Sequence, residues 1–170
     1  QRIAGSASAV AFAGQTRIVA VHEQHALVVW NSQTQWELER VIGSPDVPDM
    51  IVDRVTAVHF GPDGKQLASG SGQPSRSGEL KIWNVETGAL VSTIADAHSD
   101  SIFSVEFGPQ GKYLASCGAD RFMKVFDATT GKHLKSFEGH THHVLGVSWR
   151  ADGRMLATGG ADNVIKLWDF

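Results

Sequence analysis

The stretch Gly139–Asp169, GHTHHVLGVSWRADGRMLATGGADNVIKLWD, decides the fold. Its apolar residues alternate with polar ones or form short runs, and compact turns rich in Gly, Asp and Asn separate these runs. This pattern is typical of short antiparallel strands. The predicted strands are Val144–Trp149, Met155–Gly160 and Ile165–Asp169, with turns at 151–153 and 161–163. An ordinary β-meander has the same local pattern, so the remaining chain must decide between a meander and a repeat architecture.

Three earlier segments repeat this pattern, which a simple meander gives no reason to expect. Ala97–Asp127 matches the last segment without a gap. Asp53–Asn84 matches it with a short insertion around Gln73–Arg76, and Ala7–Asn31 is a shorter and more divergent copy. The chain therefore contains four related repeats.

The ends of the repeat carry a recognisable pair of dipeptides. Gly139-His140 opens the last repeat and Trp168-Asp169 closes it about thirty residues later, inside a repeat of roughly 40–45 residues. In these features the chain resembles the WD-repeat family. The resemblance implies an all-β fold of β-propeller blades, each of four antiparallel strands. The chain is then a single propeller segment with about four blades, at about residues 7–42, 53–94, 97–138 and 139–170.

The number of blades leads to an expectation about assembly. WD-type propellers usually close with seven or eight blades, so four blades are expected to form half of an eight-bladed ring. Blade one is expected to place its fourth strand at Trp36–Ile42, whereas blade four lacks an outer strand. We expect Gln1–Gly5 to supply that strand to a second copy, which makes the chain a homodimer. Both ends of the sequence look cut, as in a segment of a larger protein.

Composition narrows the range of partners. The chain has 170 residues, of which 42% are hydrophobic and 19% charged, so it can bury a core. Its net charge of −3 gives no general attraction to nucleic acid or to an anionic membrane, and neither is expected as a partner. The single cysteine, Cys117, is expected to be a small buried side chain. The compartment stays open, with a soluble cytoplasmic location as the default.

A set of polar residues recurs at the spacing of the repeat. In the WD-repeat family a His, a Ser or Thr, an Asp and a Trp form a hydrogen-bonded chain inside one blade. By resemblance, His140, Thr158, Asp162 and Trp168 form this structural network in blade four, and His98, Ser116 and Asp120 form a shorter one in blade three. Phe126 replaces the tryptophan of blade three and removes its N–H donor.

The same residue types could also serve chemistry. His98, Ser116 and Asp120 resemble a nucleophilic triad, and His140 with His142 and His143 offers metal-ligand types. Repetition argues against catalysis, because a catalytic set occurs once whereas this constellation recurs with the fold. We therefore expect no enzyme activity, no metal and no cofactor.

Partner binding is the remaining function. The resemblance implies docking on the face that carries the entries to the first strands, where the candidate residues are Phe103, Leu145, Thr56, Arg121, Arg54 and His143. They would form an apolar centre with a basic rim, which suits a peptide or protein. The sequence therefore predicts a non-catalytic binding scaffold whose partner is unknown. Two alternatives stay open: a structural segment without activity of its own, and a propeller enzyme with His142 and His143 in a central channel.

Overall fold

The computed structural model of the chain comprises two compact units, residues 1–40 and 41–170. It describes the strand backbones at 7–13, 17–22 and 27–31, then Leu38 and residues 40–42, 50–51 and 53–170. These described residues form strands, turns and irregular segments, and no helix occurs among them. The same part of the chain accordingly has no helix that could cross a membrane. The all-β class predicted from the sequence is confirmed.

The first unit contains one antiparallel sheet. Its strands are β1 (Ala7–Ala13), β2 (Arg17–His22) and β3 (Leu27–Asn31), in the order β1-β2-β3. The fourth strand predicted at Trp36–Ile42 is not formed by the residues described there, Leu38 and 40–42. Leu38 is 82% exposed and Val41 is 73% exposed, so neither of these two side chains packs against a sheet. Gln1–Gly5, predicted to exchange between copies, lies outside the described residues.

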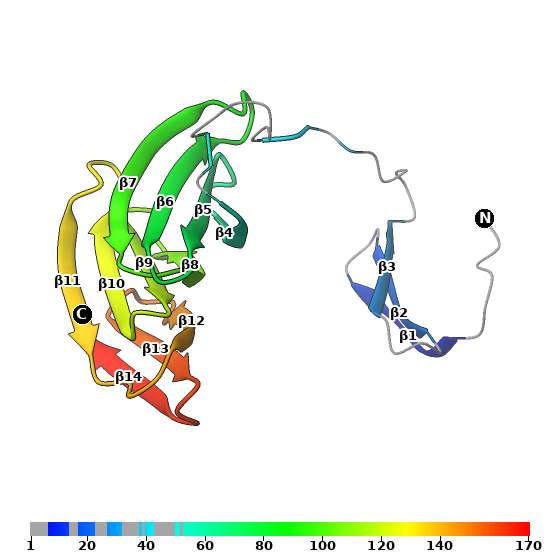
Figure 1. The fold of residues 1–170 in the computed structure, drawn as a ribbon. Helices are drawn as coiled ribbons and strands as arrows, with labels where there is room; N and C mark the ends of the chain where they lie inside the picture. The colour runs from blue at the N-terminus through cyan, green and yellow to red at the C-terminus, as the bar shows by residue number, and fades with distance from the viewer. Residues whose placement is uncertain are drawn as a thin grey trace. The chain divides into compact units, whose positions relative to one another are not determined.

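The second unit contains three antiparallel sheets that follow one another along the chain (Figure 1). In each sheet the strands pair in sequence order, as in a meander. Blade two consists of β4 (Val55–Phe60), β5 (Gln66–Gln73), β6 (Ser77–Asn84) and β7 (Leu90–His98). Blade three consists of β8 (Ile102–Phe107), β9 (Tyr113–Gly118), β10 (Phe122–Asp127) and β11 (His133–Glu138). Blade four consists of β12 (Val144–Trp149), β13 (Met155–Gly160) and β14 (Ile165–Asp169).

All four sheets share one register. The first two strands of each sheet pair with a β-bulge near the start of the first strand, at Ala7/Ala9, Val55/Ala57, Ile102/Ser104 and Val144/Gly146. An extra residue at a bulge turns the strand and increases its twist. Because the bulge recurs at the same place, each blade starts with the same local geometry, and equivalent residues can be compared directly between blades.

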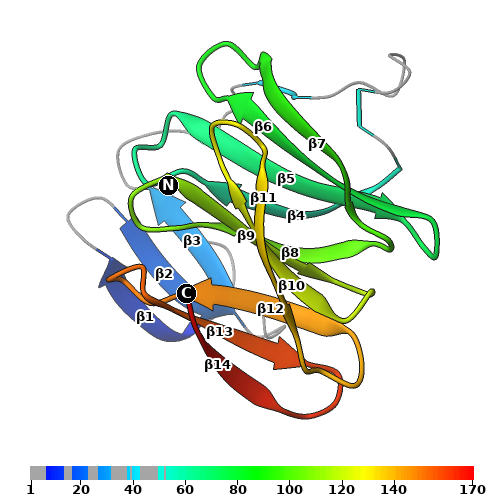
Figure 2. The ribbon, with the colours of Figure 1, turned by 90° about the vertical axis from the view of Figure 1, so that its left-hand side faces the viewer.

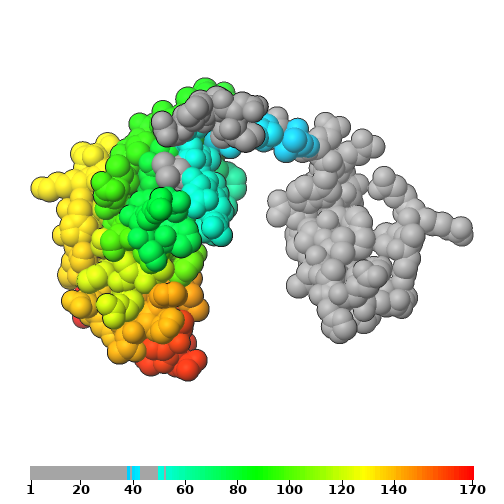
Figure 3. Space-filling model, in the orientation of Figure 1, coloured from blue at the N-terminus to red at the C-terminus, as the bar shows by residue number. Residues whose placement is uncertain are grey.

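The sheets of the second unit pack face to face through two apolar cores. We call the face of a sheet that carries Val105 and Phe107 in blade three the leading face, and the opposite face, with Ala115 and Val125, the trailing face. The leading face of blade three packs on the trailing face of blade two, and blade four packs on blade three in the same way. Strand β8 lies between β4 and β12, which brings the first strands of the three blades together (Figure 2). In the space-filling view the surface colours of this unit change in the order in which the blades follow along the chain (Figure 3).

The hairpin insertion in blade two extends the sheet. Strands β5 and β6 continue to Gln73 and Ser77, and the turn between them is closed by the Arg76 N–H, which donates to the Gln73 carbonyl at 3.0 Å. Ser75 has a φ of 59°, in the left-handed region that non-glycine residues adopt only at a cost. Residues 73–76 are exposed, so the insertion forms a lip above the sheet.

Gly118 tests how closely the backbone at the entry to β8 approaches the end of β9 within blade three. A β-carbon at this position would lie 2.4 Å from the Ser101 carbonyl oxygen, which also accepts the Ala119 N–H at 2.9 Å. We expect Gly118→Ala to lower the free energy of unfolding by about 1–3 kcal/mol, because the backbone must shift. Chemical denaturation measures this loss.

Gly146→Ala is the matched control for that substitution. A β-carbon there meets no atom within 4 Å, and Ala57 occupies the equivalent register position in blade two. We expect a change below about 1 kcal/mol. Equal losses at the two glycines would contradict the close approach at Gly118.

Candidate functional site

Four side chains of blade four form a continuous hydrogen-bonded chain. The Trp168 indole N–H donates to Thr158 Oγ1 at 2.8 Å, and the same oxygen lies 2.8 Å from His140 Nε2. His140 Nδ1 lies 2.9 Å from both carboxylate oxygens of Asp162. His140 and Thr158 are 6% and 1% exposed, so the chain is shielded from water. The structure thus brings together all four residues of the set inferred from the sequence.

Two links of this chain have a fixed direction. An indole N–H can only donate, so the Thr158 hydroxyl accepts from Trp168. A carboxylate can only accept, so His140 Nδ1 donates to Asp162. The Thr141 N–H donates to that carboxylate at 3.0 Å as well. Each of these groups has a hydrogen-bond partner, which offsets the free-energy cost of removing it from water.

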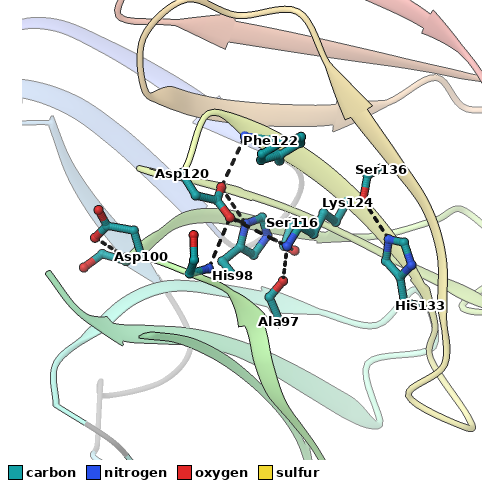
Figure 4. A network of polar contacts seen from close by, with 11 residues as sticks. Ala97, His98, Asp100, Ser116, Asp120, Phe122, Lys124, His133 and Ser136 are labelled. Carbon is teal, nitrogen blue, oxygen red and sulfur yellow. Dashed lines mark hydrogen bonds and ion pairs between the residues drawn. The ribbon is translucent and has the colours of Figure 1, made fainter. Parts of the chain in front are cut away.

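Blade three contains the same arrangement without the tryptophan (Figure 4). His98 Nε2 lies 2.8 Å from Ser116 Oγ, and His98 Nδ1 lies 2.9 Å from both oxygens of Asp120. Lys124 Nζ donates to the Ala97 carbonyl at 2.7 Å and lies 3.7 Å from Asp120. His98 is the last residue of β7, so a strand of blade two provides the histidine of the blade three network.

The networks shorten from blade four towards blade two. Phe126 stands where blade four has Trp168, and it packs at 2% exposure without a polar contact to Ser116. Blade two keeps only the first link, in which the Trp83 indole N–H donates to Ser69 Oγ at 2.8 Å. The side chain of Trp30, the corresponding residue of blade one, lies outside the described residues.

Burial and hydrogen bonding set the charges of the blade three network. Burial lowers the pKa of His98 below its ordinary value of 6.5, and the hydrogen bond and charge of Asp120 offset only part of this effect. Burial acts to raise the pKa of Asp120, but the hydrogen bonds from His98 and from the Phe122 N–H hold it below 3.8. The network therefore pairs a neutral imidazole with a carboxylate. Burial also raises the pKa of the nearby Cys117 thiol to about 12.

A groove of about 300 Å³ lies where the entries to the first strands of blades two, three and four meet. Phe103 forms part of its wall, with the His143 ring at a centroid distance of 5.8 Å. Arg54 lines the groove and forms an exposed ion pair with Asp53 at 3.7 Å. The Thr56 hydroxyl is within hydrogen-bonding distance of two backbone carbonyls, those of Gly70, at 3.1 Å, and of Ile102. Thr56 thus holds β4 against β8 as well as lining the groove.

Two of the six partner-binding candidates are not among the residues that line the groove. Leu145 is 52% exposed and does not line the groove. Arg121 is exposed in the turn after Asp120 with a φ of 72°. The rim was expected to be basic, but the carboxylate of Asp100 lines the groove together with Arg54, so the rim carries both signs of charge.

Sequence reasoning missed the lip of the groove. Pro74 and Ser75 of the hairpin insertion line it, together with Asp100, Ser101 and Ala119. Asp100 Oδ1 accepts the Ser75 N–H at 2.8 Å and the Ser101 N–H at 2.7 Å, which fixes the insertion above β8. The insertion was visible in the sequence as the departure of blade two from the repeat, but the sequence did not indicate that it lines the groove.

The histidines near the groove have local contacts. The His142 and His143 rings are tilted by 55° with their centroids 4.5 Å apart, and the His143 N–H donates to His142 Nδ1 at 2.9 Å. Among the described residues, no three His, Cys, Asp or Glu side chains come close enough together to hold a metal ion.

Comparison with known families matches these blades directly. The family model of the WD domain, G-beta repeat, matches residues 52–84, 88–127 and 131–169, more than half of the chain. The chain belongs to the WD-repeat family. The sheets within the matched residues are therefore WD-type propeller blades, and a WD-repeat domain is a protein-interaction kind of domain. The matched segments begin at residue 52, after the divergent first repeat at Ala7–Asn31.

A curated relative supports the same assignment. The chain is 33% identical over 92 residues to the nuclear distribution protein PAC1 of Coccidioides posadasii (strain C735). The match covers 52% of this WD-repeat chain and 19% of the relative. The chain thus spans about a fifth of the length of that protein.

Asp120 tests the structural role of the WD-repeat network. We expect Asp120→Ala to lower the free energy of unfolding by about 1–3 kcal/mol, because His98 and the Phe122 N–H lose their acceptor inside the blade. Asp63→Ala is the control, since Asp63 accepts only an exposed turn N–H from Lys65. A loss at Asp63 as large as the loss at Asp120 would exclude a special contribution of the network.

The pH dependence of stability tests the neutral state of His98. With a folded-state pKa below 6.5, His98 contributes stability that is complete above pH 6.5 and is lost as the pH falls, because the unfolded chain binds the proton first. The lowered pKa of Asp120 extends this loss to pH values below 3.8. We expect Tm to fall on acidification, with a shallower slope in His98→Gln than in the wild type. A Tm that rises between neutral pH and pH 5 would contradict the neutral state.

Proposed function

We propose that the chain is a non-catalytic scaffold that binds a peptide or protein segment in the groove at Phe103. The observation that supports it most is the groove itself, an indentation with an aromatic wall at the junction of three blades. Aromatic anchors in a concave site carry much of the energy of protein recognition. The aligned polar residues serve the fold, so they leave no repeated set for catalysis.

The groove favours an extended segment with both apolar and polar groups. Phe103 offers an apolar contact, whereas Arg54 and Asp100 offer charges of opposite sign at its edges. One of the two carboxylate oxygens of Asp100, Oδ1, already accepts hydrogen bonds from two backbone N–H groups. A ligand side chain would therefore meet one aromatic surface and two charged edges, which is the polar rim and apolar centre typical of interfaces.

The name of the curated relative describes a general role and identifies no binding partner for this chain. PAC1 is a nuclear distribution protein by name, and the matched region covers 19% of it. The ligand of the groove is therefore a property to be tested in this chain itself.

A displayed library of random peptides tests the binding proposal without knowledge of the partner. We expect enrichment of a peptide class by the wild-type chain, and a loss of at least tenfold in its affinity for Phe103→Ala, about 1.4 kcal/mol. Leu134→Ala is the matched control, because Leu134 is a 41% exposed leucine on the outer strand β11. Circular dichroism verifies that each variant is folded. Peptides that bind Phe103→Ala as well as the wild type would overturn the groove assignment.

Self-association is the second part of the proposed function. Ile165 and Leu167 of blade four are 78% and 68% exposed, whereas Met123 and Val125, at the same register positions of blade three, are 1% and 0% exposed. Apolar surface of this extent marks an interface. We infer a homodimer in which blades of two copies cover each other, as expected for two half rings.

Light scattering coupled to size exclusion tests the dimer. We expect a mass of about twice 18.3 kDa in the wild type and a shift towards 18.3 kDa in Leu167→Glu, because a carboxylate would be buried in the interface. Leu134→Glu should leave the dimer intact. A wild-type mass of 18.3 kDa at all concentrations would exclude self-association and leave the peptide groove untouched.

A further inference from the structure

A small pocket of about 110 Å³ lies between the first turns of blades three and four. We call it the turn pocket and define it by Gly108, Lys112, Tyr113, Trp149 and Asp152. It follows the end of β8, whereas the groove at Phe103 lies near the start of that strand, so the two sites are at opposite ends of β8. Pockets for drug-sized ligands measure about 300–1,000 Å³, so the turn pocket has the size for one small chemical group.

The indole of Trp149 brings a hydrogen-bond donor to this pocket that the fold does not use. The residue is 7% exposed, and among the described residues no acceptor lies within hydrogen-bonding distance of its buried Nε1. Its Cε2 atom, which is bonded to Nε1, lies 3.6 Å from the place where a β-carbon of Gly108 would stand. The nitrogen edge of the ring thus faces the pocket wall at Gly108. An unpaired buried donor costs free energy, so an acceptor that reaches it from the pocket is favoured.

The other blades show that packing alone does not require this donor. Phe60 and Phe107 occupy the register position of Trp149 in blades two and three. Phe107 is 3% exposed and fills its interface with a ring that has no polar atom. The tryptophan of blade four therefore adds an N–H group beside a pocket, at a position where a phenylalanine suffices for the core.

The charges around the turn pocket favour an anion. Asp152 is a carboxylate, but Arg150 Nε donates to its Oδ1 at 2.9 Å and Arg150 Nη2 donates to its Oδ2, so its charge is balanced. These hydrogen bonds lower the pKa of Asp152 to about 2, which keeps the pair ionised at neutral pH. Lys112 takes part in no ion pair among the described residues, and its ammonium lies 5.1 Å from the centroid of the Tyr113 ring. The lysine charge is therefore available to a ligand.

We propose that the turn pocket binds a carboxylate group on a short apolar stem. One carboxylate oxygen accepts the Trp149 indole N–H, the other faces the Lys112 ammonium, and the stem contacts the Tyr113 ring. Lys112 and Gln110 are exposed lining residues, so their side chains can move to admit the ligand without disturbing the core. A phosphate fits less well, because its further charged oxygens would lie against aromatic rings.

A carboxylate of this kind has two sources with the same chemistry, a free organic acid and the side chain of a glutamate in a partner protein. Both carry one anionic group on a stem of two methylene groups or their equivalent. The site is separate from the peptide groove at Phe103 and goes beyond the proposed function, so either one can be wrong without the other.

NMR spectra of the indole N–H groups test the site. The chain has five tryptophans, and the signal of Trp149 is the one that disappears in Trp149→Phe. The isotope-labelled chain is titrated with propionate and with N-acetylglutamate N-methylamide, and with sodium chloride at equal ionic strength as the control. We expect a saturable shift of the Trp149 signal with the carboxylates and none with chloride. Propionamide, which lacks the charge, should bind about threefold or more weakly than propionate.

Lys112→Gln tests the contribution of the positive charge. Lys65→Gln is the matched control, because Lys65 is exposed at the same position of the first turn in blade two and does not line the pocket. We expect Lys112→Gln to weaken propionate binding about threefold, as for an exposed ion pair, and Lys65→Gln to leave it unchanged. Circular dichroism verifies that each variant is folded.

The outcomes decide both the site and the source of the ligand. If both carboxylates leave the Trp149 signal unchanged, or shift it without saturation, the proposal is overturned. It is equally overturned if propionamide binds as well as propionate, or if Lys112→Gln binds propionate as well as the wild type. Tighter binding of the glutamate derivative assigns the site to an acidic side chain of a partner protein, and tighter binding of propionate assigns it to a free acid. Peptide binding at Phe103 is measured separately and is unaffected by these results.

Discussion

The three sheets of the second unit carry apolar residues on both faces, and the packing of this unit depends on that constraint. Contact between an apolar face and water costs free energy, so blade three has a neighbouring blade on each of its two faces. Ala115 and Val125 are both 0% exposed because blade four covers them, while Phe107 is 3% exposed because blade two covers it. Apolar burial between successive sheets, rather than contacts along any single strand, therefore accounts for the order of the blades.

The hydrogen-bonded networks solve a problem that this packing creates. A histidine and an aspartate lie next to an apolar interface, where an unpaired polar group would cost several kcal/mol. The chain from Trp168 to Asp162 removes that cost by giving each donor one acceptor. The same geometry in blade three works with one link fewer, so the tryptophan is an addition to the network and the His-Asp pair is its basis.

The repeated features of the fold were predictable from the sequence, and the unrepeated ones were not. Strand positions recur in several copies, and the resemblance to the WD-repeat family implied Thr158 and Ser116 as network residues at the repeated spacing. The prediction of a fourth strand in blade one was wrong at the residues described there, Leu38 and 40–42. The apolar pattern suggested a buried strand, whereas Leu38 is 82% exposed. The position of the groove lip depends on one hydrogen bond, which the Ser75 backbone N–H donates to the Asp100 carboxylate. A single contact of this kind does not recur in the sequence, so a periodic pattern cannot predict it.

Strand β7 belongs to two blades at once, and this has a consequence for how the molecule opens. Its backbone pairs with β6, yet its last residue, His98, places its imidazole among Ser116 and Asp120 of the following sheet. Pulling blade two away would thus break the buried polar chain of blade three as well. Local opening should consequently spread across this junction as one event, and the backbone amides of β6 and β9 should exchange their hydrogens at similar rates.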